Sequence, residues 1–221
     1  MVCASVIGTL HQTDQELTLA INSWSAPWSD IFWTTMSDIK FWIPAYVICA
    51  IFLFKMLGWK KALIVLASAA LAFGMCDQVS NLVKHSVSRL RPCYSFPMLD
   101  GGLNVLEKRG GFFGFFSAHA ANAFSFAVCM ILGFSNDKTR SYKAFRAGIL
   151  SWAALVSISR IFVGKHYLGD VLVGALIGIT IGYLLGSLSN LLIRKYLERI
   201  PSPTIQEGPS PSESPSIPSQ E

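Results

Sequence analysis

The chain has 221 residues, of which 52% are hydrophobic and only 14% are charged, and its mean hydropathy is +0.47. This composition excludes an ordinary soluble domain, in which about 25% of residues are charged. Apolar runs of about 18 or more residues predict membrane-spanning helices, because about 20 residues cross a hydrocarbon core of about 30 Å. We therefore predict an all-α fold, a polytopic membrane helix bundle. Membrane topology explains the net charge of +5 better than nucleic acid does, and no nucleic-acid partner is expected.

Residues 1–38 are predicted to form one or two short amphipathic helices that lie along the membrane surface. Apolar residues recur at helical spacing between Leu17 and Trp24, after two acidic residues. Trp24, Trp28 and Trp33 are typical of the aromatic belt at the membrane interface.

Residues 39–196 are predicted to form a transmembrane core of about five spans. Their approximate limits are Phe41 to Met56, Lys60 to Val83, Ser117 to Phe134, Ala147 to Val163 and Gly169 to Leu192. A polar, glycine-rich loop at 86–112 does not cross the membrane. Residues 197–221 are rich in proline and serine and cannot bury enough apolar surface to fold, so a disordered cytoplasmic tail is expected.

Basic residues gather at one end of the predicted spans. They are Lys55, Lys60, Lys61, Lys138, Arg140, Lys143, Arg146, Arg194, Lys195 and Arg199. The positive-inside rule places this end in the cytoplasm. The opposite end carries Lys84, Arg91, His119, Arg160, His166 and Asp170. Ionisable groups beside a membrane segment are costly, so this second group indicates a functional site.

Three short motifs contain these residues: Lys84-x6-Arg91-Pro92, Ser117-Ala118-His119 and Arg160-x5-His166-x3-Asp170. Three fixed cations suit phosphoryl transfer, because arginine can hold two phosphoryl oxygens and lysine adds a point charge. Ser117 and the first backbone N–H groups of the third span would add an anion site at a helix terminus.

The third motif also offers a nucleophile. If the fifth helix begins by His166, then His166 and Asp170 share a face, and the carboxylate can hold one imidazole nitrogen while the other attacks. His119 can then protonate the leaving oxygen as general acid. Asp77 precedes Lys84 by two helical turns, and two interpretations stay open: it tunes the lysine or lines the substrate entry, or it pairs with a neighbouring polar group.

The three motifs resemble the type-2 phosphatidic acid phosphatase family, whose pattern is K-x6-RP, then PSGH, then SR-x5-H-x3-D. They stand here as KHSVSRLRP at 84–92, FSAH at 116–119 and SRIFVGKHYLGD at 159–170. The resemblance implies a phosphate bound by Lys84, Arg91, Arg160, Ser117 and Ala118. It also implies that His166 forms a phosphohistidine, supported by Asp170, and that His119 protonates the leaving group.

The second motif departs from the family pattern at two positions. Phe116 replaces proline and Ala118 replaces glycine. The Cβ of Ala118 excludes a glycine-specific backbone conformation but fits the first turn of a helix.

The resemblance implies an integral membrane phosphatase that needs no metal or other cofactor and removes a terminal phosphate from a membrane lipid. Lipid A and undecaprenyl diphosphate are the preferred substrates, with phosphatidylglycerol phosphate and phosphatidic acid as alternatives. The expected location is the bacterial inner membrane, with the site facing the periplasm. The lipid phosphate and the bilayer are the expected partners, and the oligomeric state stays open.

Two other classes of protein compete with this interpretation. A non-hydrolytic lipid or ion transporter would also place polar residues in its spans, but here they cluster at one membrane edge instead of stepping through the midplane. A vanadate-dependent peroxidase would share the phosphate site.

Two further patterns carry expectations. Arg89, Lys108, Arg109 and Lys165 are expected to be solvated or to contact headgroups. Glycines recur every four residues along the fifth span, at Gly174, Gly178, Gly182 and Gly186. Such a row permits close helix packing, which we expect within the bundle in preference to a dimer interface.

Overall fold

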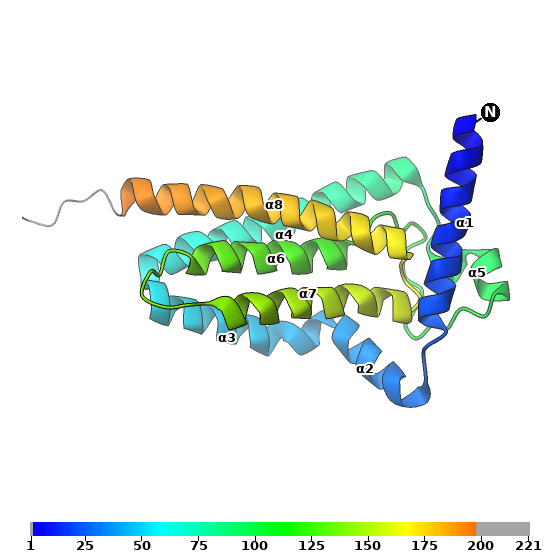
Figure 1. Cartoon of the computed structure of the whole chain (residues 1–221), viewed down its shortest axis with the longest axis horizontal. Coiled ribbons are helices and arrows are strands. Elements are labelled where there is room, and N and C mark those ends of the chain that lie inside the picture. Colours follow the sequence, from blue (N-terminus) through cyan, green and yellow to red (C-terminus); the bar gives the residue numbers. More distant parts are fainter. Residues whose placement is uncertain (1, 198–221) are drawn as a thin grey trace, which may run out of the picture.

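A computed structural model describes residues 2–197 as a bundle of long helices, seen from the side in Figure 1. In chain order the elements are α1 (Val2–Asn22), α2 (Pro27–Ser37), α3 (Ile39–Leu57), α4 (Trp59–Val87), the 3-10 turn η1 (Pro92–Tyr94), α5 (Phe96–Asp100), α6 (Ala118–Phe134), α7 (Lys143–Phe162) and α8 (Leu168–Tyr196). Residues 2–197 contain no strand, so the predicted all-α class is confirmed. Apart from Leu197, the predicted tail lies outside the described residues.

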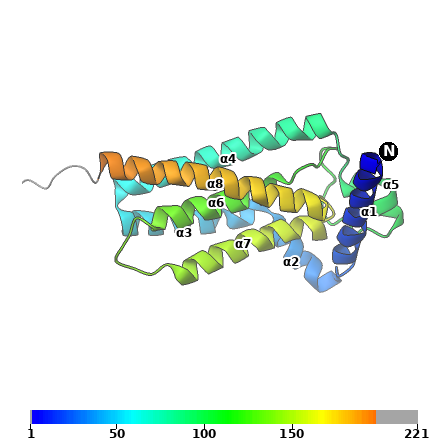
Figure 2. The same ribbon diagram turned by 45° about the horizontal axis from the view of Figure 1, so that its top comes forward.

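Five helices make up the membrane bundle. Four of them, α3, α4, α7 and α8, are long and apolar enough to cross a membrane, and their most apolar stretches have mean hydropathies between 1.3 and 2.1. The fifth, α6, is apolar but has 17 residues, a length of about 25 Å. The five helices run roughly parallel in both views (Figure 1, Figure 2). They correspond to the five predicted spans.

The centre of the bundle is α6, which packs against α4, α7 and α8. The glycine row of α8 faces it directly. A methyl group added at Gly178 would lie 2.2 Å from the carbonyl oxygen of Ala121, and one at Gly174 would lie 2.5 Å from that of Ser117. The row therefore brings two helix backbones together inside the bundle, as predicted. The close approach also sets the start of α8 beside the start of α6.

The N-terminal segment differs from its prediction. Two helices form here, as expected, but α1 is a long helix of 21 residues from Val2 to Asn22 and lies across one end of the bundle (Figure 1). Trp24 and Trp28 are 76% and 80% exposed, as an interfacial belt requires. Trp33 is instead half-buried and stacks on Phe162 at 4.0 Å between ring centroids. Its ring therefore packs against the end of α7, and its place in the belt stays a prediction.

The far end of the bundle holds the α3–α4 junction, the α6–α7 loop and the end of α8 (Figure 1). Among the described residues, these segments carry Lys55, Lys60, Lys61, Lys138, Arg140, Lys143, Arg146, Arg194 and Lys195. The predicted separation of a basic end from the end with the three motifs is therefore present along the length of the bundle.

Candidate active site

The three motifs converge on one cavity of about 200 Å³ at the end of the bundle where α1 lies. Of the predicted site residues, the cavity is lined by Asp77, Lys84, Arg91, Ala118, His119, Arg160 and His166. Ser117 and Asp170 do not line it and lie behind its wall. A volume of this size accommodates a phosphoryl group but is below the roughly 300 Å³ of the smallest drug-sized sites.

The cations reach the cavity from three different segments. Lys84 lies in the last turn of α4, Arg91 in the loop that follows, and Arg160 in the last turn of α7. Arg91 is held by two backbone bonds, from its N–H to the oxygen of Phe112 at 2.9 Å and from Nε to that of Phe113 at 3.1 Å. The guanidinium is thereby oriented before any ligand arrives.

Arg160 is 5% exposed, and its Nε has no hydrogen-bond partner among the described residues. Its Nη1 donates to Ser37 Oγ and lies 3.4 Å from Glu107 Oε1. A buried guanidinium nitrogen without a partner is costly, so an anion in the cavity would satisfy it. This arrangement supports the assignment of Arg160 to phosphate binding.

His166 lies in the turn between α7 and α8, before α8 begins at Leu168. This start lies one residue before the predicted limit of the fifth span at Gly169, and the condition that the helix already includes His166 is not met. Gly164 makes the turn with a φ of +73°, and a Cβ there would meet the oxygen of Asn104 at 2.7 Å. The backbone oxygen of Arg160 accepts from the N–H groups of Lys165 and His166, which fixes His166 beside the end of α7.

The imidazole of His166 faces Asp170 across a gap. Its Nδ1 is 3.5 Å from Asp170 Oδ2, longer than a good hydrogen bond. Burial lowers the pKa of His166 to about 4, and the nearby Asp170 carboxylate only partly offsets this effect. The imidazole is therefore neutral at physiological pH, and the nitrogen turned away from Asp170 keeps its lone pair.

Arg89 was predicted to be solvated, and this was wrong. Its Nη1 donates to Asp170 Oδ1 at 2.8 Å and its Nη2 to Asp14 Oδ2 at 2.6 Å. The guanidinium also stacks over the ring of Tyr167 at 3.9 Å. Arg89 thus ties the carboxylate behind His166 to helix α1. The sequence held no signal for this bridge, because Asp14 lies 75 residues before Arg89.

Helix α1 contacts the turn that carries His166 at further points. Asp14 Oδ1 accepts from the N–H of Gly169 at 2.7 Å, and Thr18 Oγ1 accepts from that of Leu168 at 3.0 Å. Asn22 Nδ2 donates to the oxygens of Ile161 and Phe162, each at 3.0 Å. The segment predicted as a surface helix therefore also fixes the start of α8 and the end of α7.

Lys165 is the second basic residue whose prediction was wrong. It is 4% exposed, and its Nζ donates to the backbone oxygen of Lys108. Burial lowers the pKa of Lys165. Lys108 and Arg109 are exposed, as expected.

Helix α6 begins at the cavity. Ser117 caps the helix, because its Oγ accepts from the N–H of Ala120 at 3.4 Å. The backbone N–H of Ser117 donates to the backbone oxygen of Asp170 at 3.0 Å. Ala118 is the first helical residue, so its Cβ is accommodated in a helical conformation as the sequence suggested.

Asp77 both lines the cavity and accepts a hydrogen bond from Asn122 Nδ2 at 2.9 Å. Its two interpretations, as a residue at the substrate entry and as the partner of a polar neighbour, are therefore compatible.

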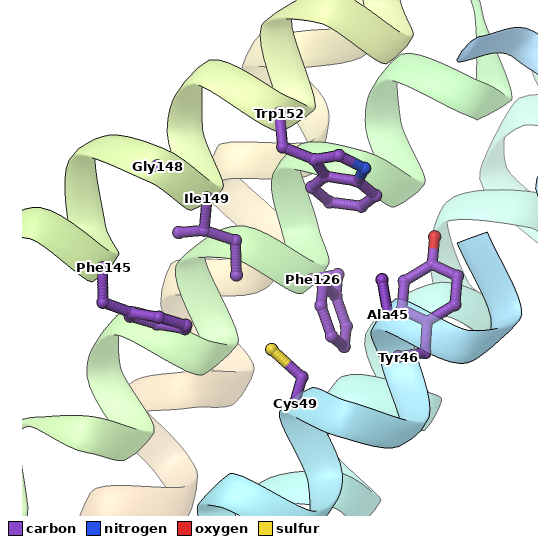
Figure 3. Close-up of a pocket in the computed structure, with 8 residues that line it drawn as sticks. All are labelled: Ala45, Tyr46, Cys49, Phe126, Phe145, Gly148, Ile149 and Trp152. Atoms are coloured by element: carbon purple, nitrogen blue, oxygen red, sulfur yellow. The ribbon is translucent and has the colours of Figure 1, made fainter.

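An apolar furrow of about 240 Å³ lies further along the bundle, between α3, α6 and α7 (Figure 3). It is lined by Ala45, Tyr46, Cys49, Phe126, Phe145, Gly148, Ile149 and Trp152. A narrow gap lies between the furrow and the site cavity, and it shares Tyr46 with the furrow and His119 with the cavity. An apolar surface therefore leads from the polar site toward the middle of the bundle.

These observations describe a cavity lined by cations and histidines at one end of a helical membrane bundle, and comparison with known proteins identifies the family of the chain. A sequence model of the PAP2 superfamily matches residues 58–193, and the chain belongs to this superfamily. It is a membrane lipid phosphatase, an enzyme that hydrolyses phosphate monoesters, as the motifs indicated.

Two curated relatives share most of the chain, and both are named lipid A 4'-phosphatase. The protein from Bacteroides thetaiotaomicron is 34% identical over 200 residues, which cover 90% of this chain and 86% of the relative. The protein from Porphyromonas gingivalis is 30% identical over 173 residues, covering 78% of this chain and 71% of the relative.

Two solved structures share the fold. The PAP2-type phosphatidylglycerolphosphate phosphatase from Bacillus subtilis has a TM-score of 0.67 and 22% identity, covering 83% of this chain and 88% of that chain. LpxE from Aquifex aeolicus has a TM-score of 0.57 and 24% identity, covering 77% of this chain and 92% of that chain.

Proposed function

We propose that the chain removes the 4'-phosphate of lipid A at the periplasmic face of a bacterial inner membrane. The site cavity supports the reaction, because three cations, two histidines and space for one phosphoryl group meet at the end of the bundle opposite the basic loops. The substrate is proposed from the two relatives that carry the name lipid A 4'-phosphatase. Undecaprenyl diphosphate, phosphatidylglycerol phosphate and phosphatidic acid are the alternatives, since each presents a terminal phosphate.

The first chemical step transfers the phosphoryl group to His166. The Nε2 atom attacks phosphorus, because Nδ1 faces Asp170 and carries the proton in that tautomer. The bond between phosphorus and the lipid oxygen breaks, and His119 donates a proton to that oxygen. Lys84, Arg91 and Arg160 stabilise the charge that spreads over the phosphoryl oxygens.

The second step releases phosphate. A water molecule attacks phosphorus and gives a proton to His119, and the phosphorus–nitrogen bond breaks. His166 returns to its neutral form and His119 to its protonated form, so both residues are ready for another turnover. During the cycle the Asp170 carboxylate, itself paired with Arg89, stabilises the positive charge of the phosphorylated imidazole.

The apolar furrow supports an amphiphilic substrate. Its polar neighbour is the site cavity, so a lipid whose phosphate lies between Arg91 and Arg160 can place an acyl chain along α3 and α7. The acyl chain would bury apolar surface in the furrow and would stay inside the bilayer.

Phosphate release from purified lipid A tests this proposal, with the product identified by its mass. We expect His166→Asn to abolish turnover, and His119→Asn to lower it by about 10²–10⁴-fold, the usual contribution of a general acid. His85→Asn is the matched control, because His85 is an exposed histidine on α4 that does not line the cavity. Undiminished turnover in His166→Asn would contradict the mechanism, and a wild-type enzyme inactive on lipid A would contradict the substrate.

A further inference from the structure

A second, larger hollow adjoins the site cavity. This outer chamber has a volume of about 670 Å³ and lies between the end of α2, the start of α3 and the loop before α6. Its polar lining, apart from the site residues, is provided by Thr34, Ser37, Asp38, Lys40 and Glu107. His119 and Arg160 line both hollows, so the two hollows are neighbours. One substrate could therefore place its phosphate in the cavity and the group bonded to that phosphate in the chamber.

The sizes of the two hollows indicate which part of the substrate each of them fits. The cavity of about 200 Å³ holds a phosphoryl group, whereas the chamber has the size of a site for a drug-sized ligand. His119 lies at the boundary, and the proposed general acid must contact the oxygen that joins the phosphoryl group to the rest of the headgroup. The part of the headgroup that carries this oxygen therefore falls in the chamber.

The chamber wall is rich in hydrogen-bond acceptors. The hydroxyl of Thr34 donates to the backbone oxygen of Asp30 at 2.8 Å, and that of Ser37 donates to Glu107 Oε1 at 2.5 Å. Both hydroxyl protons are thus in use, so each oxygen can only accept; that of Ser37 already accepts from Arg160 Nη1, whereas that of Thr34 is left for a ligand. The carboxylates of Asp38 and Glu107 accept only, and Lys40 is the cationic exception in the lining apart from Arg160.

We propose that the outer chamber binds the sugar ring that carries the phosphate, and that Thr34 and Asp38 recognise its hydroxyl and amide N–H groups. The inference rests on the proposed function and adds the part of the site that selects the headgroup. A neutral ring with several donors matches a wall of acceptors. A second phosphate at this position could donate no hydrogen bond to these acceptors. It would face two carboxylates, with Lys40 as the remaining cation of the lining once Arg160 holds the first phosphate. The chamber therefore favours a sugar-borne phosphate over the terminal phosphate of a diphosphate lipid.

Thr34→Val and Asp38→Asn test this inference, because the side-chain hydrogen bonds of both residues stay within α2 and the start of α3: Thr34 bonds the backbone oxygens of Asp30 and Ile31, and Asp38 accepts from the N–H of Lys40. Asparagine retains an oxygen to accept from the Lys40 N–H and so preserves the cap of α3. Thr35→Val and Asp100→Asn are the matched controls. Thr35 lies on the same helix as Thr34, and its hydroxyl donates to the backbone oxygen of Ile31 at 2.7 Å. Asp100 is exposed at the end of α5. Neither residue lines the chamber.

The measurements are the KM and kcat for lipid A and the inhibition constant for inorganic phosphate, which requires the cavity alone. We expect each chamber variant to raise the KM for lipid A at least fivefold, and the pair together at least tenfold. The inhibition constant for phosphate should stay within twofold of wild type, and the control variants should match wild type in both. The wild-type enzyme should also prefer lipid A to undecaprenyl diphosphate in kcat/KM.

Three outcomes would overturn the inference: an unchanged KM in the double variant, a parallel weakening of phosphate inhibition, or an equal or better kcat/KM for the diphosphate lipid. Each differs from failure of the proposed function, which would show as a wild-type enzyme that releases no phosphate from lipid A. If lipid A is hydrolysed, the variants alone decide whether the chamber recognises its sugar.

Discussion

His166 shows how burial prepares a single residue for its proposed role. The side chain is 2% exposed, and its pKa is lowered from 6.5 to about 4, with desolvation as the largest cause. Within this net change, Asp170 raises the pKa, and the charges of Arg160 and Arg91 make smaller contributions that lower it. Desolvation exceeds the effect of the carboxylate, so the nucleophile is neutral without help from a separate base.

The titration of His166 can be followed by nitrogen-15 NMR of the histidine rings in detergent-solubilised protein. We expect the signals that vanish in His166→Asn to stay those of a neutral imidazole from pH 8 to pH 5, with a midpoint at about pH 4. In Asp170→Asn the midpoint should fall, because the lost negative charge favoured the protonated ring. A wild-type midpoint near pH 6.5 would show that the ring is not desolvated.

Residue types and spacing predicted the chemical groups of the site but not their partners. Lys84, Arg91 and Arg160 were recognisable because cations are costly beside membrane spans. Arg89 and Lys165 carry the same charge and look alike in sequence. Their separate roles depend on contacts with distant segments, Arg89 with α1 and Lys165 with the loop at Lys108. Only the fold reveals these contacts.

At the scale of the helices, hydrophobic length predicted the five spans, and the glycine row predicted which face of α8 packs closely. Helix α1 was less predictable. Its amphipathic pattern indicated a surface helix, and its exposed apolar residues agree with that reading. Its inner face also carries polar residues, however, and Asp14, Thr18 and Asn22 form hydrogen bonds to the end of α7 and the start of α8. Polar residues of this kind are indistinguishable in sequence from those that face water.

The apolar furrow leads to a prediction about the face of α7 that lines it. Gly148 on α7 lines it, and an added Cβ there would meet nothing within 4 Å, so Gly148→Leu introduces a side chain at the furrow with no clash at Cβ. If the new side chain displaces two methylene groups of the acyl chain from the furrow, the loss of binding free energy is about 1.6 kcal/mol. This corresponds to a roughly tenfold loss of affinity. We expect kcat/KM for a long-chain lipid phosphate to fall by about this factor, and that for p-nitrophenyl phosphate to stay unchanged.

Gly74→Leu is the matched control for this variant. Gly74 lies on α4, is exposed, and also has nothing within 4 Å of an added Cβ, but it does not line the furrow. Both substitutions replace glycine in a spanning helix and so change helix propensity by the same amount. Equal losses in the two variants, or a loss on both substrates, would show that the furrow does not hold the chain.

The whole molecule is polarised along its length. The proposed site and helix α1 occupy one end, and nine basic residues of the described chain occupy the other. Positive residues next to short loops favour retention in the cytoplasm. Arg160 and Lys165, two basic residues at the end with the site, are buried in the protein and are therefore not exposed loop charges that would oppose this tendency.

This polarity predicts the orientation of the enzyme in a bacterial inner membrane. Single cysteines are introduced at Lys108 and Lys138, both exposed, after replacement of the five native cysteines. In intact spheroplasts a membrane-impermeant maleimide should label Lys108→Cys, whereas Lys138→Cys should react only after the membrane is opened. The reverse pattern would place the site in the cytoplasm. It would contradict the periplasmic assignment but not the proposed chemistry, because the contacts around His166 are the same in either orientation.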